Sequence, residues 1–244
     1  QRTPNAHNIF KIDSTMSTTT LLPRVEMESA PNPTAAVIWM HGLGADGNDF
    51  APLAPQLDLA GCQPIRFIFP HAPSIPVSIN NGYVMPAWYD ILTADLVRRE
   101  DPAGIHTSAV AIEALIAHEA ARGIQPANIV LAGFSQGCAM ALHTGLRHSE
   151  KLAGIMALSG YLPLADSVAA ERSPANANTP IFMAHGTQDP VVQLPRAEAS
   201  RDALKALGYT VDWHTYPMPH SVHPQEVADI GAFLRKVLAA KSPA

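Results

Sequence analysis

The chain has 244 residues, of which 47% are hydrophobic and 15% charged, with a formal net charge of −5 at pH 7. This composition is that of a globular protein and excludes an intrinsically disordered chain. The negative charge argues against binding to nucleic acid, and against binding to an anionic membrane by charge alone. No apolar run approaches the roughly 20 residues that a membrane-spanning helix needs. No stable membrane anchor is therefore expected, and the default location is cytoplasmic.

The N-terminal residues lack the layout of a secretory signal, a basic segment followed by an apolar one. Met16 is followed by a Ser-Thr-Thr-Thr run and resembles a natural start. Residues 1–15 are therefore hypothesised to be an expression tag or linker, and residues 16–244 a single α/β domain. The intact mass of the natively expressed protein tests this boundary.

Strands and helices are expected to alternate along the chain, which predicts a mostly parallel central sheet with helices on both faces. Residues before Pro33 are expected to add antiparallel edge strands. The expected elements are, in chain order, a strand over 35–40, a helical stretch near 49–59, a strand over 65–69, a Pro-rich loop over 70–86, a helix over 105–122, a strand over 128–132, a helix over 138–147, a strand over 154–158, a polar excursion over 161–179, a strand around 182, a helix near 195–207, a strand over 210–216 and a helix near 224–240.

A Gly-Phe-Ser-Gln-Gly sequence at 133–137 lies between an expected strand and an expected helix. G-x-S-x-G in this context is typical of the nucleophile elbow of α/β-hydrolases. Its glycines permit a turn too tight for flanking side chains, which exposes the Ser135 oxygen at the carboxyl end of the sheet. The N–H of Gln136, in the first turn of the helix, is placed to face a developing oxyanion. The alternative is a Gly-Ser turn in an ordinary βα unit, because five loosely defined positions also occur by chance.

Two further residues complete the chain order that this fold uses for a triad, Ser, then Asp, then His. Asp189 lies in the loop after the strand around Phe182, and His220 lies in the loop after the strand over 210–216. Both are at carboxyl ends of strands, where catalytic side chains lie in open α/β sheets. His223 is a rival for the role of base, but it precedes Pro224 near the start of the last helix and is expected to point into solvent.

The oxyanion hole needs a second donor, and the loop after the first expected strand supplies one. It reads His-Gly-Leu-Gly at 41–44, and glycines there let the backbone approach a ligand closely. The N–H of Leu43 is expected to be the second donor. His41 is interpreted as structural, since a loop histidine beside a strand end often only hydrogen-bonds the backbone.

Six motifs in this order resemble the phospholipase/carboxylesterase family, which includes bacterial carboxylesterases and eukaryotic acyl-protein thioesterases. The resemblance runs from about Pro33 to about Val237. Pro219 and Cys138 stand where glycine is usual in the family, and neither departure removes a catalytic atom. The motifs are HGLGADGNDF at 41–50, WYD at 88–90, GFSQG at 133–137, LSGY at 158–161, HGTQDPVV at 185–192 and HSV at 220–222.

The resemblance implies a compact α/β-hydrolase with little or no cap domain. It also implies a catalytic triad of Ser135, Asp189 and His220, and an oxyanion hole formed by the backbone N–H groups of Leu43 and Gln136.

Two loops are expected to form an apolar groove for an acyl chain. Residues 72–77 are apolar and stiffened by proline, and residues 161–164 follow the strand beside the elbow strand. The alternative for each side chain is that it only packs in the core. The residues expected to line the groove are Ile75, Val77, Met85, Trp88, Leu162 and Leu164.

Neither a metal nor an organic cofactor is expected. Two cysteines cannot make a disulfide framework, and Cys62 and Cys138 are interpreted as reduced, buried small hydrophobes. No C-x-x-C or H-x-x-x-H pair indicates a metal site, and no G-x-G-x-x-G follows a strand, so no dinucleotide is expected.

The expected function is hydrolysis of short- to medium-chain carboxylic esters through an acyl-enzyme. His220 takes the Ser135 proton, Asp189 fixes the histidine tautomer, and two N–H groups stabilise the oxyanion. The expected partner is a small-molecule acyl ester or thioester, and a homodimer is left open. One alternative is acyl-protein thioesterase or lysophospholipase activity at the same site. A second is a dienelactone hydrolase, which a Cys nucleophile in place of Ser135 would favour. A third is an inactive binding module, which would require that a triad member be missing.

Overall fold

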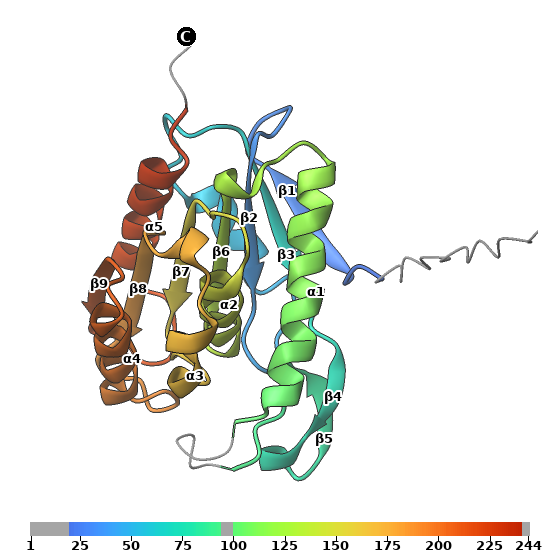
Figure 1. Ribbon diagram of the computed structural model, residues 1–244, viewed down its shortest axis with the longest axis vertical. Helices are drawn as coiled ribbons and strands as arrows, with labels where there is room; N and C mark the ends of the chain where they lie inside the picture. The colour runs from blue at the N-terminus through green and yellow to red at the C-terminus, as the bar shows by residue number, and fades with distance from the viewer. Residues whose placement is uncertain (1–19, 94–99, 241–244) are drawn as a thin grey trace, which may run out of the picture.

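The computed structural model describes residues 20–93 and 100–240, so the boundary expected at residue 15 lies outside the described residues. A seven-stranded sheet runs through the molecule (Figure 1). Its strands are β1 (Arg24–Glu28), β2 (Ala35–Met40), β3 (Ile65–Pro70), β6 (Ile129–Phe134), β7 (Gly154–Leu158), β8 (Ile181–Gly186) and β9 (Val211–Tyr216). Their order is β1-β3-β2-β6-β7-β8-β9. β1 is the antiparallel edge strand expected from the N-terminal residues, and the other neighbours are parallel.

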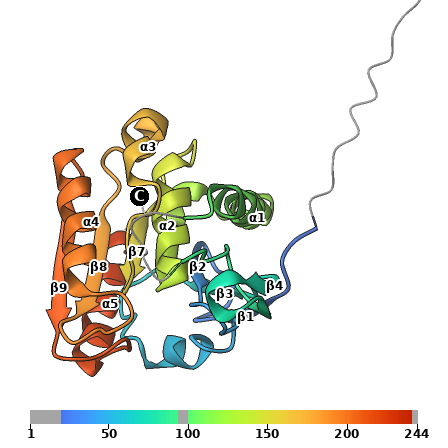
Figure 2. The ribbon, with the colours of Figure 1, turned by 90° about the horizontal axis from the view of Figure 1, so that it is seen from below.

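Helices lie on both faces of the sheet, which confirms the α/β-hydrolase architecture (Figures 1 and 2). Two hydrophobic clusters join the sheet to the helices. One packs one face of the sheet against the helices over 102–121, 136–147 and 194–206, and the other packs the opposite face against the helix over 224–237. The helices are α1 (Pro102–Ala121), α2 (Gln136–Arg147), α3 (Ala165–Glu171), α4 (Leu194–Ala206) and α5 (Pro224–Val237).

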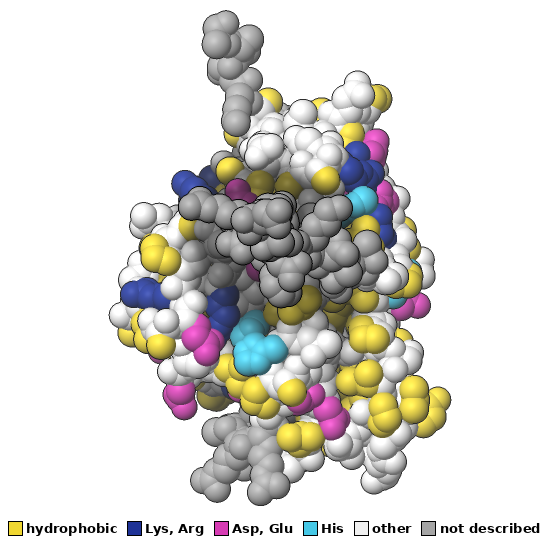
Figure 3. Space-filling model, turned by 45° about the vertical axis from the view of Figure 1, so that its right-hand side comes forward, with side chains coloured by type: hydrophobic (Ala, Val, Ile, Leu, Met, Phe, Trp, Pro, Cys, Tyr) yellow, Lys and Arg dark blue, Asp and Glu magenta, His cyan; other side chains and the backbone are white. Residues whose placement is uncertain are grey.

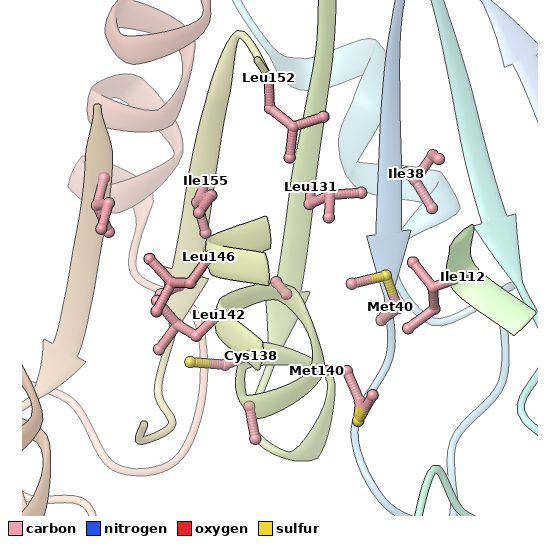
Figure 4. Close-up of a cluster of buried hydrophobic side chains, with 14 of the residues drawn as sticks. Ile38, Met40, Ile112, Leu131, Cys138, Met140, Leu142, Leu146, Leu152 and Ile155 are labelled. Carbon is pink, nitrogen blue, oxygen red and sulfur yellow. The ribbon is translucent and has the colours of Figure 1, made fainter. Parts of the chain in front are cut away.

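The central strands are continuous apolar runs because both of their faces are covered. Every residue of β2 is buried. Its side chains alternate between the clusters, with Ile38 and Met40 in the first and Val37 and Trp39 in the second, as the two-residue period of a strand requires. Figure 4 shows the first cluster, in which side chains of α2 lie against β6 and β7.

Three irregular segments differ from the sequence expectation. The Pro-rich loop over 70–86 contains a two-stranded antiparallel hairpin, β4 (Ser74–Val77) and β5 (Tyr83–Pro86). The helical stretch near 49–59 is a 3₁₀ helix over Ala51–Gln56, and the excursion over 161–179 contains α3. Prolines obscure the hairpin in the sequence, but a two-stranded ribbon has only edge strands, which tolerate proline.

Within the described ranges, every helix is too short or too polar to cross a membrane. Both cysteines are free thiols; Cys138 is buried and Cys62 only partly so. Burial raises the pKa of the Cys138 thiol, so it is an inert core side chain rather than a second nucleophile.

Candidate active site

The nucleophile elbow lies at the junction of β6 and α2. Ser135 has φ 55° and ψ −115°, a region that non-glycine residues occupy at a cost of roughly 1–3 kcal/mol. Its N–H donates to the Leu158 carbonyl on β7 at 2.9 Å. A Cβ on Gly133 would collide with the Gly137 carbonyl, and one on Gly137 would collide with the Met40 carbonyl. Both glycines of the motif are therefore required, and the serine side chain projects from a turn that the surroundings hold in place.

Asp189 and His220 are brought together from the loops that follow β8 and β9. His220 Nδ1 lies 2.7 Å from Asp189 Oδ2. The other carboxylate oxygen, Oδ1, accepts the N–H groups of Val191 and Val192 at 2.8 and 2.9 Å. Asp189 is 6% exposed, so its charge is held in a protected site by three hydrogen bonds. With Nδ1 occupied by the carboxylate, Nε2 is the nitrogen that His220 has available for chemistry.

The loop carrying His220 is fixed against the elbow and against the Asp189 loop. The His220 ring lies 4.8 Å from the Phe134 ring, and Phe134 directly precedes Ser135. The backbone N–H groups of Thr187 and Gln188 donate to carbonyls of the β9 end and of the loop after it, at 2.8 and 3.1 Å. These hydrogen bonds tie the two loops together, which supports the Asp189–His220 pair.

A second histidine, which the sequence reasoning missed, lies under the same carboxylate. His185 at the end of β8 is 1% exposed, and its Nε2 lies 2.7 Å from the Val192 carbonyl and 3.5 Å from Asp189 Oδ2. Burial lowers the pKa of His185, so the neutral ring donates its Nε2–H and closes the loop over 185–192. The signals were its position at a strand end, four residues before the aspartate, and its place as the first residue of the motif at 185–192.

The expected oxyanion donors belong to two backbone segments that adjoin the nucleophile. A Cβ placed on Gly42 would be 3.4 Å from the Ser135 Cβ, so the backbone before Leu43 passes directly over the serine. Gln136 is the first residue of α2, where backbone N–H groups have no partner within the helix. Both positions are compatible with donation to an oxyanion bound beside Ser135.

The Gln136 side chain has a separate structural role. Its Oε1 accepts the Trp88 N–H at 2.8 Å, and its Nε2 donates to the Tyr89 carbonyl at 2.7 Å. The Trp88 indole N–H donates to the His41 carbonyl at 2.9 Å. His41 Nε2 accepts the N–H of Ala72, which leaves Nδ1–H to donate to the backbone. His41 is therefore the structural histidine that was expected.

His223 does not point into solvent, and that expectation was wrong. Its Nδ1 accepts the Gln225 N–H at 3.1 Å, and its own N–H donates to Glu226 Oε2 at 3.1 Å. The ring stacks on Tyr216 with an interplanar angle of 14°. His223 therefore caps α5, and its proton-accepting nitrogen is already used.

The sequence profile described as Phospholipase/Carboxylesterase matches residues 23–238. The chain belongs to this family. It is 44% identical over 236 residues to an acyl-protein thioesterase 1 of Gibberella zeae, covering 93% of this chain and 100% of that protein. It is 46% identical over 214 residues to an acyl-protein thioesterase 1 of Neurospora crassa, covering 84% and 87%.

Solved structures of similar proteins agree with this assignment. Crystal structures of Arabidopsis thaliana SOBER1 and of Zea mays acyl-protein thioesterase 2 match with TM-scores of 0.79 and 0.77 and identities of 31% and 29%. They cover 84% and 88% of this chain and 99% of each of those chains. As a member of the phospholipase/carboxylesterase family, the chain is an enzyme of the serine hydrolase class with esterase or thioesterase activity.

Two of the expected groove residues line a large cavity formed by described residues. Leu162 and Leu164 border a cavity of about 1110 Å³ between α3, α4 and the Asp189 loop, where Pro190 and Val191 form another part of the wall. The sequence had connected the loop over 161–164 with the acyl group, and two residues of that loop line this cavity.

The other four expected groove residues lie elsewhere. Val77 and Trp88 are 0% and 2% exposed, so they pack in the interior and do not line an open groove. Ile75 and Met85 face each other across the β4–β5 hairpin and are half-buried. The hairpin carries exposed hydrophobic side chains, which gather at the lower right of Figure 3.

A smaller cavity of about 380 Å³ adjoins His220 and was not anticipated from the sequence. In the sequence, this cavity is marked by the Asp-Phe pair at 49–50, the last two residues of the motif over 41–50 that follows β2. The described residues that line it are Asp49, Phe50, Pro52, Leu53, Gln56, Phe134, His220, Ser221 and Val222.

One group in the described part of the chain has the composition of a metal site, Glu26, His118 and Glu119. Its carboxylates are already paired with arginines. Arg122 lies 3.0 Å from Glu26 and 2.8 Å from Glu119, and Arg66 lies 2.7 Å from Glu119. A cation would have to displace these ion pairs, so the group is better described as a charge network that joins β1, β3 and α1.

Proposed function

We propose that this enzyme hydrolyses acyl thioesters, with acyl groups attached to protein thiols as its principal substrates and carboxylic esters as secondary ones. The observation that carries the proposal is the 2.7 Å contact of His220 with the buried Asp189, in a loop that packs on Phe134, the residue before the elbow serine. The choice of thioester is supported by relatives named acyl-protein thioesterase 1, which are 37–46% identical to this chain.

The proposed mechanism assigns one role to each group. His220 Nε2 takes the proton of Ser135 as its oxygen attacks the acyl carbonyl, and Asp189 stabilises the imidazolium. The N–H groups of Leu43 and Gln136 hold the oxyanion of the tetrahedral intermediate. Collapse breaks the carbon–sulfur bond, His220 protonates the departing thiolate, and an acyl-enzyme remains. Water then attacks, His220 takes its proton, and Ser135 regains that proton as the carboxylic acid leaves.

The acyl chain is placed in the larger cavity. Leu162, Leu164 and Val191 are apolar residues of its lining, which also contains charged residues such as Glu100, Asp166 and Arg196. A cavity of this size accommodates medium and longer chains as well as the short ones expected from the sequence. We therefore expect kcat/KM to rise with chain length from acetyl through octanoyl.

The test is a panel of acetyl, octanoyl and palmitoyl thioesters of one cysteine peptide, with the matching serine oxoesters and a lysophospholipid. Fluorophosphonate labelling of the wild type, Ser135→Ala and His220→Ala is measured in parallel. We expect thioester turnover and labelling in the wild type, and the loss of both in Ser135→Ala. A tenth of wild-type kcat in Ser135→Ala would exclude it as the nucleophile, and a lysophospholipid preferred over every thioester would replace the proposed substrate.

A further inference from the structure

We propose that the smaller cavity, beside His220, is the subsite for the leaving group, and that it selects an apolar leaving group that is neutral or cationic rather than anionic. The proposal rests on the proposed function, because it assumes that His220 is the general acid of the acylation step. It also assigns the two parts of the substrate to different cavities. The acyl chain occupies the larger cavity, and the departing thiol or alcohol occupies the smaller one.

Proton delivery decides which cavity the leaving group uses. When the tetrahedral intermediate collapses, the departing sulfur or oxygen must lie within roughly 3 Å of the protonated nitrogen of the general acid. His220, Ser221 and Val222 form one wall of the smaller cavity. Among the described residues that line the larger cavity, none belongs to this loop. Of the two cavities, the smaller one adjoins the general acid, and the proposal assigns the leaving group to it on that ground.

The other walls of the smaller cavity are aromatic and apolar. Phe134 lies 4.8 Å from the His220 ring, and Phe50 lies 5.3 Å from Phe134. Phe50 is in turn stacked on the buried Trp39 at 5.3 Å. This row of rings connects the core to the catalytic histidine, so the wall is rigid. Leu53 completes the apolar lining from the 3₁₀ helix. The first atoms of a leaving group that follow its sulfur or oxygen are therefore expected to be apolar.

The charge at the rim of the smaller cavity determines which groups are favoured in the outer part of the leaving group. Asp49 is exposed at the rim, and no Lys or Arg is among the described residues that line the cavity. The chain as a whole carries a net charge of −5. A cationic leaving group is attracted and an anionic one repelled. Because the rim is hydrated, the effect of one carboxylate is modest, about two- to five-fold in kcat/KM.

The experiment uses octanoyl thioesters that share the acyl group and differ only in the thiol. Thiocholine is the cationic thiol, 3,3-dimethylbutanethiol its neutral isostere and 3-mercaptopropionate the anionic thiol, and benzyl and methyl thiols provide a size series. Stopped-flow measurements separate acylation from deacylation, whose rate constant is independent of the thiol because the thiol has already left.

Leu53→Trp fills the cavity, and we expect it to lower acylation by the benzyl thioester at least tenfold relative to the methyl thioester, with deacylation unchanged. Gln56→Trp, at an exposed position on the same rim, is a second filling variant that does not disturb the core. Val191→Trp is the matched control in the larger cavity. It is expected to change the dependence on acyl chain length and leave the dependence on the thiol unchanged.

Asp49→Asn is expected to lower the ratio of kcat/KM for thiocholine to that for 3-mercaptopropionate by about two- to five-fold. Asp166→Asn, an exposed aspartate on the larger cavity, is the matched control and is expected to leave the ratio unchanged. Equal losses for all thiols in both filling variants, or deacylation slowed as much as acylation, would overturn the proposal. An active Ser135→Ala or His220→Ala enzyme would instead refute the proposed function, so the two failures are distinguishable.

Discussion

Replacing Glu226 with glutamine should remove a large part of the pH dependence of stability. Glu226 lies in the first turn of α5 and is 0% exposed. Burial raises its pKa to about 7, the His223 N–H acts in the opposite direction, and Asp229 adds to the rise. Oε2 accepts the His223 N–H, whereas Oε1 has no hydrogen-bond partner among the described residues. Glutamine keeps an acceptor for that N–H and removes the charge.

The magnitude follows from the difference between the two pKa values. An ordinary glutamate titrates at 4.5 and Glu226 at about 7, a gap that corresponds to about 3 kcal/mol. Because the folded pKa is the higher one, the folded state binds the proton more tightly. The contribution to the free energy of unfolding is therefore complete below about pH 4.5, is lost as the pH rises, and is absent above about pH 7. The glutamine variant has no such loss.

Urea unfolding of the wild type and Glu226→Gln at several pH values between about 5 and 8 measures this difference. The variant should gain stability relative to the wild type as the pH rises, by up to about 3 kcal/mol. Glu150→Gln, at an exposed position, is the control. Contributions from other titrating groups cancel in each comparison. A flat difference for Glu226→Gln would show that the buried carboxyl is solvated in a way that its burial does not suggest.

Three further outcomes test the site. His220→Ala should lower kcat/KM by several orders of magnitude. His223→Ala should change kcat/KM little but cost about 1 kcal/mol of stability, because it removes a helix cap. Steady-state kinetics measures the first effect and urea unfolding the second. His185→Phe leaves the Val192 carbonyl without its donor. It should therefore cost about 1–3 kcal/mol of stability and lower kcat with little change in KM, and an unchanged kcat would refute the role given to His185. Prolonged dialysis against a chelator should leave turnover unchanged; loss of activity that a divalent ion restores would favour a metal-activated water instead.

The sheet and its catalytic edge could be predicted because they depend on simple periodic signals. Buried parallel strands read as uninterrupted apolar runs, and the carboxyl ends of parallel strands meet at one edge. Asp189 and His220 could therefore be paired from chain order, and the structure places them in contact. The hairpin over 74–86 could not be predicted, because its prolines argue against strands and only its position outside the main sheet makes them tolerable.

The groove was predicted less well because loop side chains have no periodicity. Trp88 is turned inward by a hydrogen bond from its indole to the carbonyl of His41, 47 residues away in the chain. His223 is turned by a cap that forms only once α5 begins at Pro224. The partner of Trp88 is therefore invisible in the local sequence, and the capping partners of His223 at 225 and 226 are recognised only once the start of the helix is known. An apolar or aromatic residue in a loop therefore predicts burial more reliably than it predicts contact with a ligand.

Pro219, which stands where the family usually has glycine, can be explained by the hydrogen bonds of its loop. The Met218 N–H donates to the Tyr216 carbonyl at 2.8 Å, and the Met218 carbonyl accepts the Gln188 N–H at 3.1 Å. These bonds fix the approach to His220 from residue 218, so the donor that proline lacks is not needed there. Proline instead restricts the unfolded chain, which stabilises a compatible folded loop by about 0.4–1 kcal/mol. Pro219→Gly should therefore lower the free energy of unfolding by this amount or somewhat more, and leave kcat/KM unchanged. A kcat/KM that falls tenfold while stability is unchanged would show that the ring of Pro219 itself sets the pose of His220.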